Sequence, residues 1–172
     1  MRQPKKVLIL GIGNYLMGDE GVGVHVANRL MKDNLPVWVT AMDGGTGGFH
    51  LLEYFETYDK IILIDATLDN REPGTIRLIK PKFAKDFPPA MSTHDIGLKD
   101  LVSALQLLGK MPEIDLFVVS IASIQQQGIE LTPEIELSVP RVVTLIKGLL
   151  SQKAALSSFE DRPQSLPANV AI

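Results

Sequence analysis

With 172 residues, of which 45% are hydrophobic and 22% charged, the chain has the size and composition of one compact globular domain rather than of a disordered or fibrous protein. Its formal net charge of −3 gives no broad basic field, so neither nucleic acid nor an anionic membrane surface is an expected partner. Because the chain contains no cysteine, disulfide scaffolds, iron–sulfur clusters, thiolate metal sites and a cysteine nucleophile are excluded, and any metal ion must be bound by His, Asp or Glu.

The first predicted element is a strand over Val7 to Ile12, a continuous apolar run that ends in glycines, as in a strand buried on both faces. The basic residues before it resemble the start of a signal peptide. The apolar stretch is short, however, and no small-residue cleavage site follows it. No apolar run in the chain approaches the roughly 20 residues that span a bilayer. We therefore expect a cytoplasmic protein without a membrane anchor.

Strands and helices are then predicted to alternate. Apolar residues at helical spacing begin at Gly21, and a second strand follows over Val37 to Met42. After a glycine-rich stretch, a helical pattern covers Phe49 to Phe55, and a third buried strand covers Lys60 to Asp65. The third strand is apolar between its first residue and its last, which is Asp65.

The second half of the chain continues this alternation. The expected elements are an edge strand over Gly74 to Ile79, a helix over Leu98 to Leu108, a strand over Asp115 to Ile121 and a helix over Pro133 to Leu150. Thr132 is placed to cap the last helix, and Pro140 is expected to kink it or to mark its true start. Residues 151–172 lack apolar periodicity and are expected to form a flexible tail.

Alternating strands and helices predict a three-layer α/β/α fold with a mostly parallel, twisted sheet of about five strands. Residues 1–150 would form this single domain, and residues 151–172 its tail. In such a sheet, ligands bind beyond the carboxyl ends of the strands. Candidate functional residues are therefore the polar side chains that follow each strand.

Acidic residues follow each of the first three predicted strands. These are Glu20 with its neighbour Asp19, then Asp43, then Asp65. His94 lies in a loop before the helix over Leu98 to Leu108 and is the natural nitrogen donor. Glu20, Asp65 and His94 would supply two oxygens and one nitrogen and leave positions open for water or substrate, as catalytic metal sites require. Such a set suits zinc, nickel or manganese better than copper(I).

Each candidate also has a purely structural interpretation. Asp19 or Glu20 could serve only to stabilise a helix start by about 0.3–1 kcal/mol. Asp65 could cap a turn, although a buried acid is costly unless it is paired or bound. His94 could bridge loop and helix, and Asp43 could merely shape a glycine turn. The other two histidines, His25 and His50, lie within helical patterns and favour packing or surface roles.

A dinucleotide-binding protein is a competing hypothesis, because Gly11 and Gly13 follow a strand and Asp43 ends the next one. However, Leu16 stands where the third glycine of that fingerprint belongs. Asp19 and Glu20 also place negative charge where a pyrophosphate would approach. Walker A, H-E-x-x-H and G-x-S-x-G motifs are missing from the sequence. A metal-binding protein without enzymatic activity is a second alternative.

From about Val7 to Leu150, the chain resembles the hydrogenase maturation endopeptidases, which process the large subunit of nickel–iron hydrogenases. The stretches that carry this resemblance are, in order, GIGNYLMGDEGVGVHV, MDGGTGG, ILIDA, STHD, LFVVSIA and LTPEIELSVPRVV. Their order and spacing are more specific than any one of them. The resemblance implies that Glu20, Asp65 and His94 are metal ligands and that Asp43 is a further functional residue.

The resemblance also implies an unusual use of metal. The client would be the precursor of a hydrogenase large subunit, cleaved near its C-terminus after nickel insertion. The divalent metal would be the nickel ion that this substrate already carries, with zinc or cadmium able to take its place in vitro. The enzyme would then be a metal-dependent endopeptidase that needs no covalent intermediate.

Overall fold

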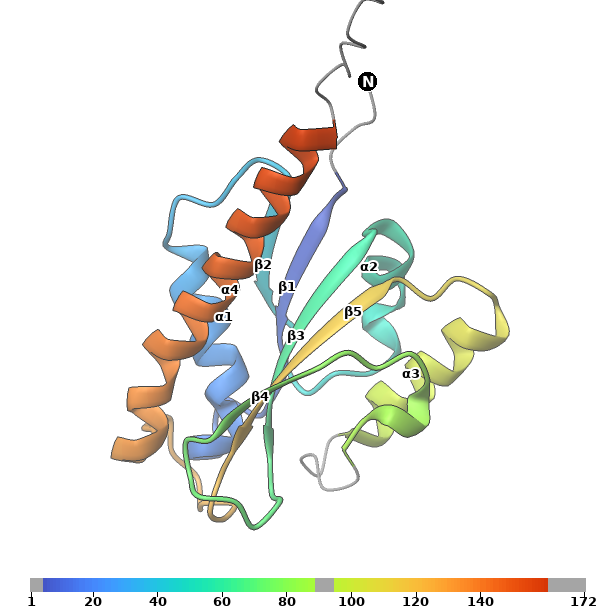
Figure 1. The fold of residues 1–172 in the computed structure, drawn as a ribbon. Coiled ribbons are helices and arrows are strands. Elements are labelled where there is room, and N and C mark those ends of the chain that lie inside the picture. Colours follow the sequence, from blue (N-terminus) through green and yellow to red (C-terminus); the bar gives the residue numbers. More distant parts are fainter. Residues whose placement is uncertain (1–4, 89–94, 161–172) are drawn as a thin grey trace, which may run out of the picture.

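The computed structural model describes residues 5–88 and 95–160 and has the predicted three-layer α/β/α architecture (Figure 1). Its sheet has five strands in the order β2-β1-β3-β5-β4. The strands are β1 (Val7–Gly11), β2 (Val39–Asp43), β3 (Lys60–Thr67), β4 (Ile76–Ile79) and β5 (Glu113–Ser120). All pair in parallel except β4, which is antiparallel to β5 and forms one edge. The predicted fold class is confirmed.

Helices cover both faces of the sheet, with α1 and α4 on one side and α2 and α3 on the other (Figure 1). The helices are α1 (Val22–Met31), α2 (Leu52–Thr57), α3 (Asp95–Leu107) and α4 (Pro133–Glu160), with short 3-10 turns η1 (Gly18–Gly21), η2 (Phe49–Leu51) and η3 (Ala84–Asp86). Alternate residues of each strand enter the two cores, because side chains along a strand point to opposite faces. In the part of the chain that the structure describes, no helix is long and apolar enough to cross a membrane.

Glycines allow α1 to approach the sheet at backbone distance. A Cβ atom added at Gly23 would collide with the carbonyl oxygens of Ile12, directly after β1, and of Ile64, in the carboxyl-terminal half of β3. A Cβ at Gly11 would collide in turn with the backbone of Gly23. Only glycine therefore permits this contact, which holds the start of α1 against the carboxyl ends of the two central strands.

The last helix departs from the prediction in two ways. It begins at Pro133, so Pro140 lies inside it and does not mark its start. It also continues to Glu160, so the predicted tail is wrong for residues 151–160, while residues 161–172 lie outside the described residues. The added turns are rich in helix-forming Ala, Leu, Lys and Gln, which sustain a helix without apolar periodicity. Lys153 in these turns is half-buried, and burial lowers the pKa of its ammonium group.

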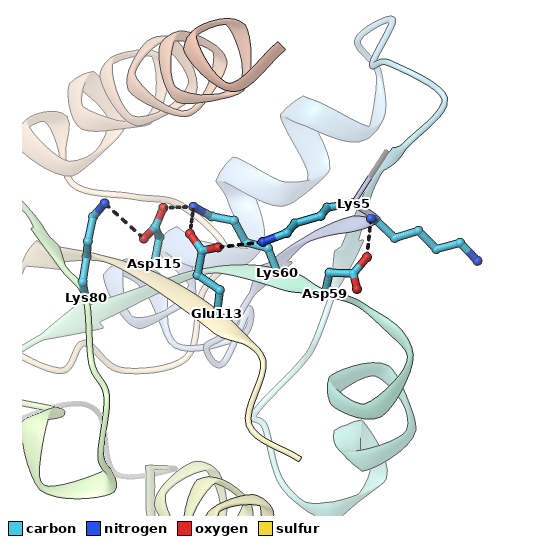
Figure 2. A network of polar contacts seen from close by, with 7 residues as sticks. Lys5, Asp59, Lys60, Lys80, Glu113 and Asp115 are labelled. Carbon is cyan, nitrogen blue, oxygen red and sulfur yellow. Dashed lines mark hydrogen bonds and ion pairs between the residues drawn. The ribbon is translucent and has the colours of Figure 1, made fainter. Parts of the chain in front are cut away.

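An ion-pair network lies at the end of the sheet where the parallel strands β3 and β5 begin, which we call the amino edge (Figure 2). The side chain of Lys60 is only 10% exposed, and its Nζ lies 2.6 Å from Asp115 Oδ2 and 2.8 Å from Glu113 Oε1. Burial alone would lower the pKa of Lys60, but the contacts with Asp115 and Glu113 outweigh it and raise this pKa. The contact with Lys60 lowers the pKa of Glu113. Lys60 therefore keeps its charge inside the protein because two carboxylates compensate it.

We expect Gly23→Ala to lower the free energy of unfolding by about 3 kcal/mol, because the new methyl group meets backbone atoms that cannot move aside. The matched control is Gly148→Ala in α4, where no atom lies within 4 Å of an added Cβ. That variant should gain up to about 1 kcal/mol from better helix propensity. Urea denaturation of both variants checks this, and equal stabilities would contradict the close contact.

For the amino-edge network, Asp115→Asn should lower the free energy of unfolding at pH 7 by about 3–5 kcal/mol, because it leaves the buried Lys60 ammonium undercompensated. The double variant Lys60→Met/Asp115→Leu should recover most of this loss, since it removes both buried charges together. Lys80→Gln is the control, because Lys80 is 67% exposed and 3.9 Å from Asp115. An Asp115→Asn variant within about 0.5 kcal/mol of the wild type would contradict the assignment.

Candidate functional site

Glu20 lies in η1, directly after the loop that follows β1, and is 1% exposed. The loop can pass close to η1 because Gly13 has a φ of +145°, and a side chain there would collide with the Glu20 carbonyl. The Glu20 N–H donates to the Met17 carbonyl at 3.3 Å. The backbone around Glu20 is thus held in one arrangement, as a precisely placed ligand requires.

Asp65 lies near the carboxyl end of β3 and is completely buried. It is on the same face of β3 as Ile61 and Leu63, which pack in the core beneath α2 and α3. Its Oδ1 accepts a hydrogen bond of 2.7 Å from the Ala66 N–H. An acid in this position is placed by a rigid central strand rather than by a loop.

The structure brings Glu20 and Asp65 to the same edge of the sheet. From β1, the chain crosses to β2 on one side, and β3 lies on the other side, so the strand order reverses between β1 and β3. Ligands of open α/β sheets bind at such a switch point, beyond the carboxyl ends of the strands. Because η1 contacts β3, the segment that carries Glu20 lies against the strand that carries Asp65.

Asp43 ends β2 on the far side of β1, opposite Gly11 in the strand register. It is exposed, and its Oδ1 accepts a hydrogen bond of 2.7 Å from the Gly45 N–H, which shapes the glycine turn. The Gly45 carbonyl accepts in turn from the Gly13 N–H at 2.8 Å. Asp43 therefore stabilises a loop that is bonded to the loop preceding Glu20, and its further role stays a prediction.

His94, the third predicted ligand, lies outside the described residues. The helix that follows it, α3, begins at Asp95 and packs on the face of the sheet toward which Asp65 points. Within residues 5–88 and 95–160, no three His, Asp or Glu side chains gather as a metal site would require. The complete ligand set therefore stays a prediction, with two of its members placed at one edge.

Asp19 has a structural role that the sequence left open. It is 2% exposed, and its carboxylate accepts hydrogen bonds from the Thr132 N–H at 2.7 Å, the Thr132 hydroxyl at 2.8 Å and the Gln125 amide at 3.2 Å. Its own N–H donates to Gln125 Oε1 at 2.9 Å. These hydrogen bonds connect η1 to the segment that precedes α4. The Thr132 hydroxyl is used here and not as a helix cap, although its carbonyl accepts the first bonds of α4.

The same contacts weigh against a dinucleotide site. Gly11 and Gly13 are needed for backbone packing against α1 and η1. Both Asp19 and Glu20 are buried at the point where a pyrophosphate would approach the helix, so two carboxylates would oppose it.

Asp19→Ala should lower the free energy of unfolding by about 2–3 kcal/mol, because it leaves several partly buried donors of Thr132 and Gln125 without an acceptor. Amide hydrogen exchange should also become faster across residues 125–132. The control is Asp100→Ala, which removes an exposed carboxylate from α3. Unchanged stability and unchanged exchange in Asp19→Ala would show that these bonds do not hold the segment.

Comparison with known proteins identifies relatives of this chain. Residues 24–148 match the family model described as hydrogenase maturation protease. The hydrogenase expression/formation protein HupD of Bradyrhizobium diazoefficiens is 32% identical over 165 residues, which cover 94% of this chain and 86% of that protein. The hydrogenase 2 maturation protease of Escherichia coli is 34% identical over 134 residues, which cover 76% of this chain and 82% of that protein.

Solved structures show the same relationship. The hydrogenase maturating endopeptidase HybD from Escherichia coli superposes with a TM-score of 0.78 at 32% identity, covering 86% of this chain and 93% of that one. The [NiFe] hydrogenase maturation protease HybD from Thermococcus kodakarensis has a TM-score of 0.68 at 27% identity, covering 84% and 98%. Because sequence and fold agree over most of its length, the chain belongs to the hydrogenase maturation protease family, which makes it a hydrolase of peptide bonds.

Proposed function

We propose that this protein removes a C-terminal peptide from the precursor of a nickel–iron hydrogenase large subunit after nickel insertion. We further propose that Glu20, Asp65 and His94 recognise the nickel ion that the precursor carries. The observation that carries the proposal is the burial of two carboxylates, 1% and 0% exposed, at the switch point between β1 and β3. Their placement where substrates of such folds bind supports a functional role for them. The cytoplasmic location expected from the sequence is part of the proposal.

The proposed ligand set fits the metal by its chemistry. Two carboxylate oxygens and one imidazole nitrogen suit nickel or zinc, and such a partial set leaves coordination positions to the groups of the precursor. In the proposal, the nickel ion is part of the substrate, and zinc or cadmium would serve as a substitute in vitro.

In this mechanism, the residues of the chain mainly position the substrate. Glu20 and Asp65 sit on backbone that is fixed by strands and by glycine packing, so the precursor would be held with its scissile bond beside the ion. A bound divalent ion polarises a carbonyl or lowers the pKa of water. Asp43 would act as a further functional residue by fixing the loop that contacts Gly13.

A metal-binding maturation factor without catalytic activity is the remaining alternative, with a dinucleotide-binding protein less favoured still. Both are opposed by the match to a protease family over residues 24–148. A carrier would bind the metal ion without changing the mass of the precursor. Cleavage of the precursor therefore separates the protease from both alternatives.

The test is the processing of nickel-loaded precursor by Glu20→Gln, Asp65→Asn and His94→Ala, followed by mass spectrometry of the product. Each substitution removes an interaction worth several kcal/mol in the transition state, so the rate should fall on the order of 100-fold or more. Nickel-free precursor should remain uncut by the wild type.

The control for this experiment is Glu53→Gln, which neutralises an exposed carboxylate on α2, away from the switch point. It should cleave at the wild-type rate. Thermal unfolding of every variant separates loss of function from loss of fold. Undiminished cleavage by all three site variants would refute the proposed role of these residues.

A further inference from the structure

The turn that carries Glu20 is weak by itself. The 3-10 turn η1 has four residues, its N-cap residue is the apolar Met17, and the Glu20 N–H reaches the Met17 carbonyl at a long 3.3 Å. Short 3-10 turns have poor hydrogen-bond geometry and gain little stability from their own bonds. Contacts with other parts of the chain must therefore fix the place and the rotation of η1, and with them the direction of the Glu20 side chain.

The connection between β5 and α4 supplies such contacts, and it is bonded to the strand of Asp65 as well. At its start, the Ile121 N–H donates to the Thr67 carbonyl at 2.9 Å, two residues beyond Asp65 on β3. Farther along, the Gly128 carbonyl accepts from the Gly18 N–H of η1 at 2.7 Å. One segment is thus joined to both elements that carry the buried acids, so its contacts help to determine how β3 and η1 lie relative to each other.

Within this connection, Gln125 binds the residue directly before Glu20. Its Oε1 accepts from the Asp19 N–H at 2.9 Å, and its Nε2 donates to Asp19 Oδ2 at 3.2 Å. Gly18 makes room for this amide, because a Cβ atom at that position would collide with Gln125 Oε1. Consecutive side chains of a 3-10 helix lie about 120° apart around its axis, since it has about three residues per turn. An amide that holds both the backbone and the side chain of Asp19 therefore also sets the direction in which the Glu20 side chain leaves the turn.

We propose that Gln125 is a positioning residue for the cleavage reaction, whose amide holds η1 so that the Glu20 carboxylate keeps its place relative to Asp65. Ligands of a reacting centre must be held within about 0.5 Å of their productive geometry, and neighbouring hydrogen bonds supply that precision. Gln125 acts through Asp19 and η1 and not by contact with the precursor. This inference rests on the proposed function, because it needs Glu20 to be one of the residues that engage the ion of the precursor.

The test exchanges the two polar groups that meet at positions 19 and 125. Gln125→Glu keeps an acceptor for the Asp19 N–H but sets one carboxylate against another, so it should displace η1. The exchange variant Asp19→Asn/Gln125→Glu puts the amide at 19 and the carboxylate at 125. Every hydrogen bond that links these two residues and Thr132 can then form again, with the total charge of the wild type. The matched control is Gln126→Glu, which adds the same charge at an exposed neighbour.

For nickel-loaded precursor, kcat/KM of Gln125→Glu should fall on the order of tenfold, measured at a temperature at which circular dichroism shows the variant to be folded. The exchange variant and the control should stay within about twofold of the wild type. Loss of fold alone would add to the effect of any other substitution. In a Glu20→Gln background, by contrast, Gln125→Glu should cause little further loss, because the carboxylate that it misplaces is already gone.

Binding gives a second readout that does not depend on cleavage. In fluorescence anisotropy, Gln125→Glu should weaken the binding of nickel-loaded precursor more than that of nickel-free precursor, because Glu20 is proposed to engage only the ion. A substitution that merely loosened the fold would weaken the binding of both precursors equally. Gln125→Met, which is neutral and of similar length, takes the place of Gln125→Glu in all comparisons if the charged variant does not fold.

Wild-type kcat/KM in folded Gln125→Glu would overturn the inference. So would an equal loss in the Glu20→Gln background, equal weakening of both precursors, or an exchange variant that regains stability without activity. Failure of the proposed function gives a different result, because Glu20→Gln then cleaves at the wild-type rate or the wild type leaves the precursor uncut. In either of those cases Glu20 does not serve cleavage, and the positioning role of Gln125 is refuted with it.

Discussion

The close backbone contact between the start of α1 and the ends of β1 and β3 is the constraint on which the site depends. Gly11 and Gly23 permit it, because any side chain at either position would meet backbone atoms. The turn η1, which directly precedes α1, contacts β3. The segment that carries Glu20 therefore lies at the same end of the sheet as Asp65. Two buried acids from separate parts of the sequence are thereby placed at one end of the sheet.

Buried acidic residues lie at both ends of the sheet. At the amino edge, Lys60 lies between Asp115 and Glu113, so positive and negative charges compensate each other and the cluster stabilises the fold (Figure 2). At the carboxyl edge, Glu20 and Asp65 bring two buried acidic side chains to the switch point. Under the proposed function, these side chains would help to bind the cation that the substrate carries.

Much of this arrangement could be predicted from sequence, because it depends on local patterns. Apolar runs that end in Asp65 or in a glycine turn indicate buried strands, and the acids after them indicate the carboxyl edge. The division of roles between Asp19 and Glu20 could not be predicted, since the partners of Asp19 lie more than a hundred residues away along the chain. The end of α4 could not be predicted either, because helix propensity without an apolar stripe gives no periodic signal.

Nickel K-edge X-ray absorption on the precursor, alone and bound to this protein, tests the central claim most directly. If Glu20, Asp65 and His94 engage the substrate's ion, the bound sample gains oxygen and nitrogen neighbours at about 2.0–2.2 Å, by analogy with zinc sites. An Asp65→Asn complex would lose part of that shell. An identical nickel spectrum before and after formation of a proven complex would contradict the account, because cleavage would then proceed without contact between this protein and the metal.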